Sequence, residues 1–220
     1  MKLRGLITVV LLIILSLSVL VSCENDRDYD EAEVILAARE LIKKSETLNY
    51  IYYGKGFLFT DEGSGIYKKI DSAQSLKYGI DTIDELKAMT YEVFSSERAA
   101  LIIATVLSPI QDEDGKILHY ARYYQHTDES ESYIMVNGIY EYSMTNGIEY
   151  NYDGVRVYDV EGEVIVVSVP VTLTRADGKI KETELKIKLI EEENGFRICS
   201  ASHAVYDEHS DVLDDLMNKK

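Results

Sequence analysis

Residues 163–200, "EVIVVSVPVTLTRADGKIKETELKIKLIEEENGFRICS", decide the fold of this chain. Val, Ile and Thr are frequent, and apolar residues alternate with polar ones over much of the stretch, which is typical of β-strands. Asp177-Gly178 and Asn194-Gly195 are hairpin-turn sequences, so the stretch predicts three successive antiparallel strands. In "ELKIKLI" the apolar side chains point one way and the lysines the other, which predicts a sheet with one solvated face.

The same period of two extends back to Lys116 through "KILHYARYY", "SYIMVNGIYEYS" and "VRVYDVEG". Asp114-Gly115 and Asp153-Gly154 are further predicted hairpin turns. The residues from 116 onward are therefore expected to form a curved antiparallel meander.

The residues before the meander have helical spacing. Apolar residues recur along one face from Val34 to Leu48, which predicts a long helix that begins near Asp30 and ends before Gly54. Residues 54–70 then predict a hairpin with its turn at Gly63-Ser64-Gly65.

Two further helices are marked by their end signals. Thr82 and Glu85 have capping-box spacing, Ser95 is placed to cap a helix over 96–107, and Pro109 is expected to stop that helix. Helices first and a meander last indicate the α+β class, with the N-terminal helices packed on the concave face of a curved antiparallel sheet, in a domain of one lobe or two.

The N-terminus has the layout of a secretory signal, because Lys2 and Arg4 precede an apolar run from Leu6 to Leu20. The run approaches the length of a transmembrane anchor, which is the alternative interpretation. The run ends in Leu20, Val21, Ser22 and Cys23, which resemble the lipobox of bacterial lipoproteins. This resemblance implies that Cys23 is the lipidated first residue of the mature chain.

These patterns predict a division of the chain into a signal peptide (1–22), a lipidated cysteine with a polar spacer (23–29), a single α+β domain (30–205) and an acidic C-terminal tail with a short helix (206–220). The protein is then expected on the extracytoplasmic face of the bacterial membrane, held there by its N-terminal lipid.

The charge of the chain is strongly negative. The net charge is −16 over the whole sequence, and it becomes 21 − 39 = −18 once residues 1–22, with two basic residues, are removed. This charge disfavours nucleic acid and anionic lipid surfaces, and it favours solubility or a partner with a basic surface.

Few residues predict chemistry. If Cys23 carries lipid, Cys199 has no disulfide partner, and its strand-like context favours a small buried apolar residue over a reactive thiol. Four histidines, none with zinc-ligand spacing, give no reason to expect a metal or a cofactor; they are His119, His126, His203 and His209. A Cys199–His203 catalytic pair is disfavoured, because four residues of strand separate the two side chains too widely.

Tyrosine is the unusual residue of this sequence. The chain has 17 Tyr against four Phe and no Trp, and nine of the tyrosines fall between residues 120 and 158. Either these tyrosines are strand residues with packed rings and solvent-exposed hydroxyls, or they form a surface that binds a glycan, a peptide or another protein. Tyr120, Tyr123 and Tyr140 are the candidate partner-binding residues.

The middle of the chain, "TIDELKAMTYEVFSSERAA", resembles secreted inhibitors of bacterial cell-wall D,L-endopeptidases, in which a Thr-capped helix leads into an "F-S/T-x-E-x-A" helix start. Phe94, Ser95, Glu97 and Ala99 occupy the motif positions. The stretch "EENGFRICSAS" resembles the last strands of cystatin-like cone domains, with Phe196 where those often carry Trp. The resemblance spans residues 30–205 and implies a non-enzymatic inhibitor of peptidoglycan hydrolases of the Cys–His class, although a lipid anchor departs from a freely secreted family.

Three functional classes stay open: a membrane-tethered inhibitor or regulator of a cell-wall hydrolase, a cone-fold module that binds a small molecule or peptide, and an enzyme built in such a cone. An apolar pocket with a few polar groups would favour the binding module, and a flat or protruding acidic surface rich in tyrosine would favour the inhibitor. Fold alone does not decide between them.

Overall fold

The computed structural model of the chain describes residues 29–203, apart from 112, 128–130, 141–146 and 176. The described residues from Glu31 to His203 group as one compact unit. Its helices are α2 (Glu31–Tyr53), α3 (Ser72–Tyr78), α4 (Ile83–Val93), α5 (Ser96–Leu107) and the 3-10 turn η1 (Tyr152–Gly154). Its strands are β1 (Phe59–Ser64), β2 (Tyr67–Ile70), β3 (Ile110–Gln111), β4 (Ile117–His119), β5 (Tyr123–Thr127), β6 (Ser132–Asn137), β7 (Gly147–Tyr150), β8 (Arg156–Glu161), β9 (Val164–Thr174), β10 (Ile180–Glu192) and β11 (Gly195–Ile198).

The α+β class is confirmed, and every strand pair is antiparallel. The strands divide into a four-stranded sheet of order β1-β2-β6-β5, a five-stranded sheet of order β11-β10-β9-β7 with β8 also on β9, and the β3–β4 pair. The strands after residue 116 therefore do not stay together as a single meander. The division arises because β6 pairs with β2, which brings the early hairpin beside β5 and β6.

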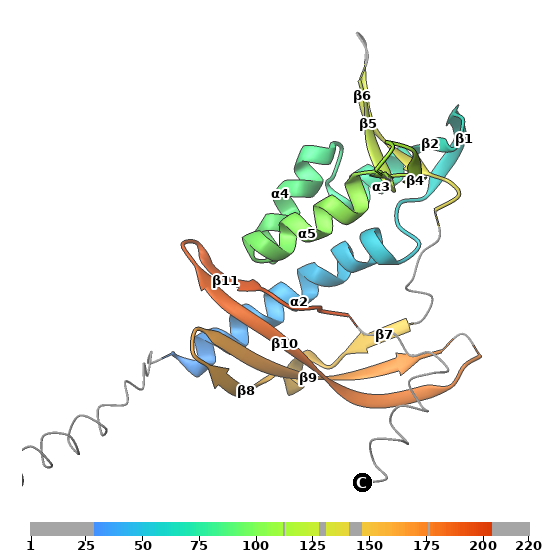
Figure 1. Ribbon diagram of the computed structural model, residues 1–220. Coiled ribbons are helices and arrows are strands. Elements are labelled where there is room, and N and C mark those ends of the chain that lie inside the picture. The colour runs from blue at the N-terminus through green and yellow to red at the C-terminus, as the bar shows by residue number, and fades with distance from the viewer. Residues whose placement is uncertain (1–28, 112, 128–130, 141–146, 176, 204–220) are drawn as a thin grey trace, which may run out of the picture. The chain divides into compact units, whose positions relative to one another are not determined.

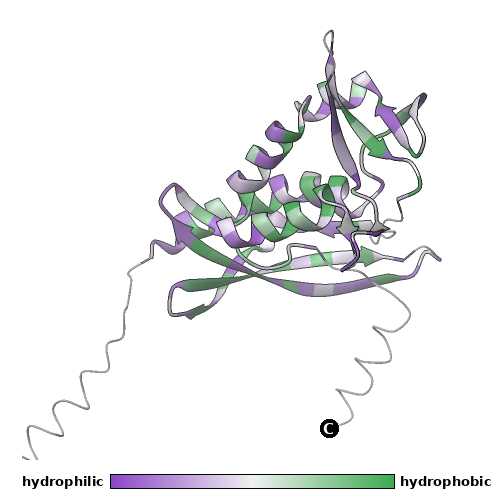
Figure 2. Ribbon diagram, turned by 45° about the horizontal axis from the view of Figure 1, so that its top comes forward, coloured by the Kyte–Doolittle hydropathy of each residue, from purple (hydrophilic) through white to green (hydrophobic). Residues whose placement is uncertain are grey.

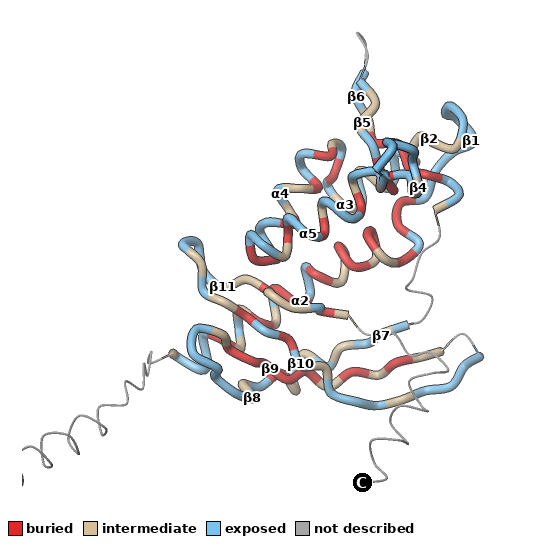
Figure 3. Tube along the Cα trace, viewed as in Figure 1, coloured by how far each residue is buried: buried red, intermediate tan, exposed pale blue. Residues whose placement is uncertain are grey.

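The five-stranded sheet buries the face predicted from its alternation. Ile165, Val167 and Val169 of β9 point inward, as do Ile187 and Leu189 of β10. Helix α2 contacts β8 and β11 on one side and α4 on the other, so it lies between the sheet and the α4–α5 pair (Figure 1). Apolar residues line these strands and helices in Figure 2, and the buried positions follow the same surfaces in Figure 3.

The predicted helix face of α2 is buried, and the helix ends at Tyr53, one residue before Gly54. The capping box of Thr82 and Glu85 is present at the start of α4. Ser95 caps α5, whose bounds agree with the predicted range. Helix α3, which begins after Asp71, is not among the predicted elements.

Two turn predictions need correction. The first concerns the β1–β2 hairpin, whose turn was predicted at Gly63-Ser64-Gly65. The turn residues are Gly65 and Ile66, because Ser64 pairs with Tyr67 while Gly63 lies inside β1. The second concerns Asp153-Gly154, which forms η1 rather than a hairpin turn.

The segment at η1 interrupts what would otherwise be one edge strand. Both β7 and β8 run antiparallel to β9, and the break between them lies beside Pro170, whose ring nitrogen carries no hydrogen for a sheet hydrogen bond. Gly154 is needed there, since an added Cβ would lie 2.7 Å from Cγ of Pro170.

A buried arginine joins the four-stranded sheet to the end of α2. The Arg122 side chain is 2 % exposed, and it donates hydrogen bonds to the carbonyl oxygens of Tyr52 and Gly54. Its Nε donates to the hydroxyl of Tyr123 at 3.0 Å, and that hydroxyl donates to the carbonyl of Ile51 at 2.7 Å. The guanidinium therefore caps the negative end of a helix whose own last turn holds no basic residue.

The expected signal, lipobox and C-terminal tail lie outside the described residues, as does Cys23. Within residues 29–203, as far as they are described, no helix has both the length and the apolar character needed to cross a membrane.

Candidate functional site

An apolar pocket lies against the outer face of the four-stranded sheet, where the end of α5 and the β3–β4 pair meet it. Its volume is about 400 Å³, within the range of small-molecule sites. Three tyrosines and no charged side chain line it, and we call it the tyrosine pocket: Ser64, Tyr67, Leu107, Pro109, Ile117, Tyr120, Ala121, Tyr124 and Met135.

The strand register places the tyrosines on this face. Tyr124 pairs with Met135, and Met135 pairs in turn with Lys69, so these three side chains share one face of the sheet. Tyr67 lies two residues before Lys69 and shares that face. The opposite face carries Tyr123, Ile134 and Val136, which are buried in the core.

Hydrogen bonds and ring contacts fix two of the pocket tyrosines. The Tyr67 hydroxyl donates to the carbonyl of Ala121 at 3.0 Å, and its ring meets that of Tyr124 edge to face with centroids 5.1 Å apart. A hydrogen bond of 3.2 Å joins the Tyr124 hydroxyl to Nδ1 of His126. Burial, followed by the neighbouring Tyr120 and Tyr124, raises the pKa of Tyr67, so this wall of the pocket is uncharged at neutral pH.

The three candidate tyrosines have separate positions. Tyr120 is 46 % exposed and lines the tyrosine pocket. Tyr123 is fully buried, so its prediction as a contact residue is wrong; desolvation raises its pKa to about 12. Its hydroxyl is held by Arg122 and Ile51 in the cap of α2. Tyr140 is half-buried, with its ring 4.8 Å from the Arg122 guanidinium carbon.

The other tyrosines of the cluster disperse over the fold. Tyr150 and Tyr152 stack on each other, and the Tyr150 hydroxyl donates to the carbonyl of Ser202. Tyr158 lies on the five-stranded sheet with the Lys186 ammonium 3.6 Å from its ring centroid. Only some of the tyrosine cluster therefore forms a common surface.

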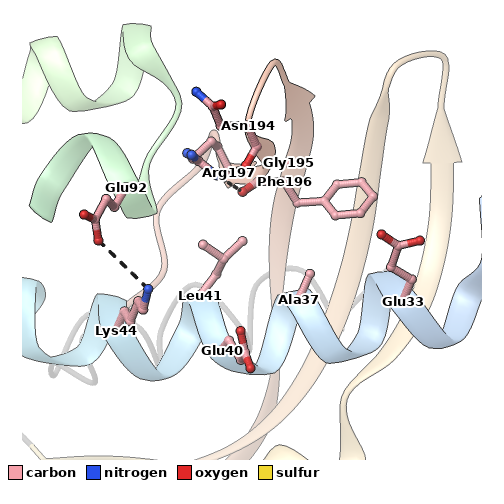
Figure 4. Close-up of a pocket in the computed structure, with 10 residues that line it drawn as sticks. All are labelled: Glu33, Ala37, Glu40, Leu41, Lys44, Glu92, Asn194, Gly195, Phe196 and Arg197. Atoms are coloured by element: carbon pink, nitrogen blue, oxygen red, sulfur yellow. Dashed lines mark hydrogen bonds and ion pairs between the residues drawn. The ribbon is translucent and has the colours of Figure 1, made fainter.

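A second pocket, also of about 400 Å³, lies between α2 and the β10–β11 turn (Figure 4). Carboxylates and cations line it together, and Lys44 is 4.0 Å from Glu92. The Arg197 guanidinium donates to the backbone carbonyls of Tyr91, Asn194 and Phe196. Arg197 thus ties the β10–β11 turn to α4, and Lys44 and Glu92 join α2 to α4, so we treat this pocket as secondary.

The described cysteine and histidines do not form a catalytic pair. Cys199 is a free, half-buried thiol whose pKa is raised chiefly by burial, which disfavours the reactive thiolate. His203 stacks on Tyr53 with ring centroids 4.6 Å apart, and burial followed by Arg98 lowers its pKa. Among the described residues no group of His, Cys, Asp and Glu could hold a metal ion. His209 lies outside them.

Comparison with protein-family models, with curated proteins and with solved structures found no match for this chain.

The residues of the inhibitor-like motif have structural roles. Phe94 and Ala99 are buried, and Phe94 forms a parallel bridge with Ile198. The backbone N–H of Ser95 donates to the carbonyl of Ile198 at 2.9 Å. The motif therefore attaches the α4–α5 junction to β11, while Glu97 is exposed.

Sequence reasoning alone does not single out Tyr67, Tyr124 or Met135 as site residues. Tyr124 and Met135 come together through the β5–β6 register, and Tyr67 joins them only because β2 pairs with β6. The available signal was alternation in "ARYYQH", which assigns Tyr123 and Tyr124 to opposite faces of a strand.

Proposed function

We propose that this protein is a lipid-anchored, non-enzymatic binding protein on the extracytoplasmic face of a bacterial membrane, and that the tyrosine pocket is its ligand site. The observation that carries the proposal is the uncharged lining of this pocket, which combines three tyrosine rings with aliphatic walls. Such a lining suits an uncharged and largely apolar group, because a charged ligand would lose its hydration without gaining a partner.

The location rests on the sequence of the N-terminus. The apolar run that ends at Leu20-Val21-Ser22-Cys23 supports lipid attachment at Cys23. Mass spectrometry of the membrane-extracted protein tests it. We expect a mature chain that begins at acylated Cys23, and an unprocessed precursor from Cys23→Ala. An uncleaved, unmodified wild-type chain would refute the anchor.

The ligand site is tested by NMR on the full chain in lipid nanodiscs, with labelled Ala and Met methyl groups. Indole and p-cresol serve as probes because they are small, uncharged and aromatic. We expect saturable shifts of the Ala121 and Met135 signals, since both residues line the pocket. Tyr120→Ala should weaken binding by about tenfold, equivalent to about 1.4 kcal/mol.

Tyr158→Ala is the matched control, because Tyr158 is 51 % exposed and Tyr120 is 46 % exposed, but Tyr158 belongs to the five-stranded sheet. This control should bind both probes like the wild type. Shifts that do not saturate, or equal losses in the two variants, would remove the pocket as the ligand site.

A second candidate function is inhibition of peptidoglycan D,L-endopeptidases. It is supported by the motif resemblance and by the net charge of −16 of the chain, which would steer it toward an enzyme with a basic surface. Exposed Tyr120 and Tyr124 beside the pocket would supply contact area.

Peptidoglycan digestion by purified Cys–His endopeptidases, with and without the full chain, tests this candidate. Inhibition at micromolar concentrations that weakens with rising salt would support it, since salt screens the steering charge over about 10 Å at 0.1 M. Undiminished digestion by every enzyme, with no binding at low salt, would exclude it and leave the ligand-binding module.

A further inference from the structure

The tyrosine pocket continues into a row of aromatic side chains on the same face of the four-stranded sheet. From Tyr124 the row passes to His126, whose ring lies 4.9 Å from that of Tyr133. The Lys69 ammonium lies 4.1 Å from the centroid of the Tyr133 ring and 3.1 Å from a carboxylate oxygen of Glu131. We call the side chains beyond the pocket, Lys69, His126 and Tyr133, the aromatic track.

The track has a direction and a length. Tyr124 and His126 are two residues apart on β5, a rise of about 7 Å. Tyr133 stands opposite His126 on β6, and Lys69 reaches Tyr133 from β2. A ligand seated in the pocket would therefore meet the track only if it extended beyond one ring-sized group.

The middle of the four-stranded sheet offers no free backbone over Met135–Asn137. There β6 is paired with β2 on one side and with β5 on the other, while β5 itself is the edge strand of this sheet. A peptide adding to a sheet needs free backbone groups at an edge. A ligand that lies across the face of the sheet, rather than along the β5 edge, is therefore recognised by side chains, through ring surfaces, hydroxyls, an imidazole and an ammonium group.

Charge limits the ligand further. The chain carries a net charge of −16, which repels anionic polymers. The ammonium on the track is paired with Glu131, and the pocket lining is neutral. The ligand that suits these conditions is elongated and neutral, with apolar surfaces for the rings and hydroxyls for the polar atoms.

We propose that the tyrosine pocket and the aromatic track together bind a neutral N-acetylated oligosaccharide. A pyranose ring has an apolar C–H face that stacks on an aromatic ring, and its rim of hydroxyls pairs with phenol, imidazole and ammonium groups. The methyl of an N-acetyl group suits the aliphatic walls at Leu107, Ile117 and Met135. This inference rests on the proposed function, because it assigns a ligand class to the same pocket.

The test is isothermal titration of the full chain in nanodiscs with the monomer and the tetramer of N-acetylglucosamine. The tetramer should bind at least about tenfold more tightly than the monomer, because only the tetramer reaches the track. Tyr133→Ala should reduce tetramer affinity by about tenfold and leave monomer affinity unchanged.

Tyr158→Ala is the matched control for Tyr133→Ala, because each tyrosine lies under a lysine ammonium on the outer face of its own sheet. The control should bind the tetramer like the wild type. The inference is overturned if the tetramer does not bind at millimolar concentration, or if Tyr133→Ala binds it normally.

The indole titration in the same preparation separates the two possible failures. If indole still shifts the Ala121 methyl signal while the tetramer does not bind, the assignment of an oligosaccharide ligand is wrong, and the pocket remains a binding site. If neither ligand binds, both the inference and the proposed function fall.

Discussion

The four-stranded and the five-stranded sheets each turn one face away from the core, and the two faces carry different chemistry. On the five-stranded sheet, Arg156 is 2.6 Å from Glu184 and Lys188 is 2.9 Å from Glu161. On the four-stranded sheet, rings meet rings, as Tyr67 and Tyr124 do beside the pocket.

Both faces arise from the same alternation of side chains along a strand. The five-stranded sheet places Lys and Glu at its outward positions, where ion pairs and hydration satisfy them. The four-stranded sheet places several tyrosines there beside the Lys69–Glu131 ion pair, and the tyrosine rings leave apolar surface beside a pocket. The ligand site that we propose therefore lies on the four-stranded face, whereas ion pairs and water satisfy the five-stranded face.

The largest expected loss of stability comes from substituting Arg122, the buried cation that joins α2 to the four-stranded sheet, which carries the tyrosine pocket. Arg122→Met should lower the free energy of unfolding by about 2–6 kcal/mol, because the carbonyls of Tyr52 and Gly54 both lose their donors inside the protein, at about 1–3 kcal/mol each. Urea denaturation measures it.

Arg156→Met is the control, because Arg156 is an exposed arginine on the five-stranded sheet. Its effect should be much smaller, since water screens the pair with Glu184. Equal losses from the two substitutions would contradict the role given to Arg122.

Gly56→Ala should give the next largest loss. Gly56 has φ +71°, and an added Cβ would collide with the Tyr123 hydroxyl and the Arg122 guanidinium. Gly65 has φ +61° with nothing within 4 Å of an added Cβ, so Gly65→Ala should cost only the backbone strain, about 1–2 kcal/mol. Thermal unfolding compares the two variants, and a Gly56→Ala loss no larger than that of Gly65→Ala would contradict the packing around Arg122.

Local signals in the sequence predicted α2, α4 and α5 but missed α3. Thr82 with Glu85 and Ser95 with the N–H of Arg98 are contacts between residues three apart, so the sequence contains both partners of each cap. The alternation of Leu185 to Leu189 likewise fixed which face of β10 is buried.

Non-local pairing explains what the sequence could not predict. Nothing near Tyr67 indicates that β2 pairs with β6, and this pairing divides the strands into separate sheets. The burial of Tyr123 follows from Arg122 reaching the end of α2, about 70 residues earlier in the chain. The site therefore depends on contacts that no short motif records.

A smaller effect on stability is expected from His203, whose ring stacks on that of Tyr53 at the end of α2. Burial lowers its pKa below the ordinary value of about 6.5, so the unfolded chain takes up the proton more readily than the folded protein. This contribution to stability should be lost as pH falls from about 6.5 through the lower pKa of the folded protein, and His203→Gln should flatten that part of the profile. Denaturation midpoints between pH 5 and pH 8 measure it, and identical pH slopes for the two proteins would refute it.

The smallest effect is expected on the solvated face. Lys188→Met removes the partner of Glu161, but both side chains are exposed. Stability should change little, and any difference from the wild type should shrink as salt is added. A large loss that persists in 1 M salt would show that the five-stranded face depends on its ion pairs more than this comparison allows.

The most direct measurement follows the tyrosines of both sheets at once. All 17 tyrosines of the full chain can carry a ¹⁹F label as 3-fluorotyrosine, with signals assigned by Tyr→Phe variants. During an indole titration, the signals of Tyr67, Tyr120 and Tyr124 should shift and saturate together, while that of Tyr158 stays in place. Shifts at Tyr158 that match those at Tyr120, or unchanged signals at all three pocket tyrosines, would contradict the assignment of the tyrosine pocket as the binding site.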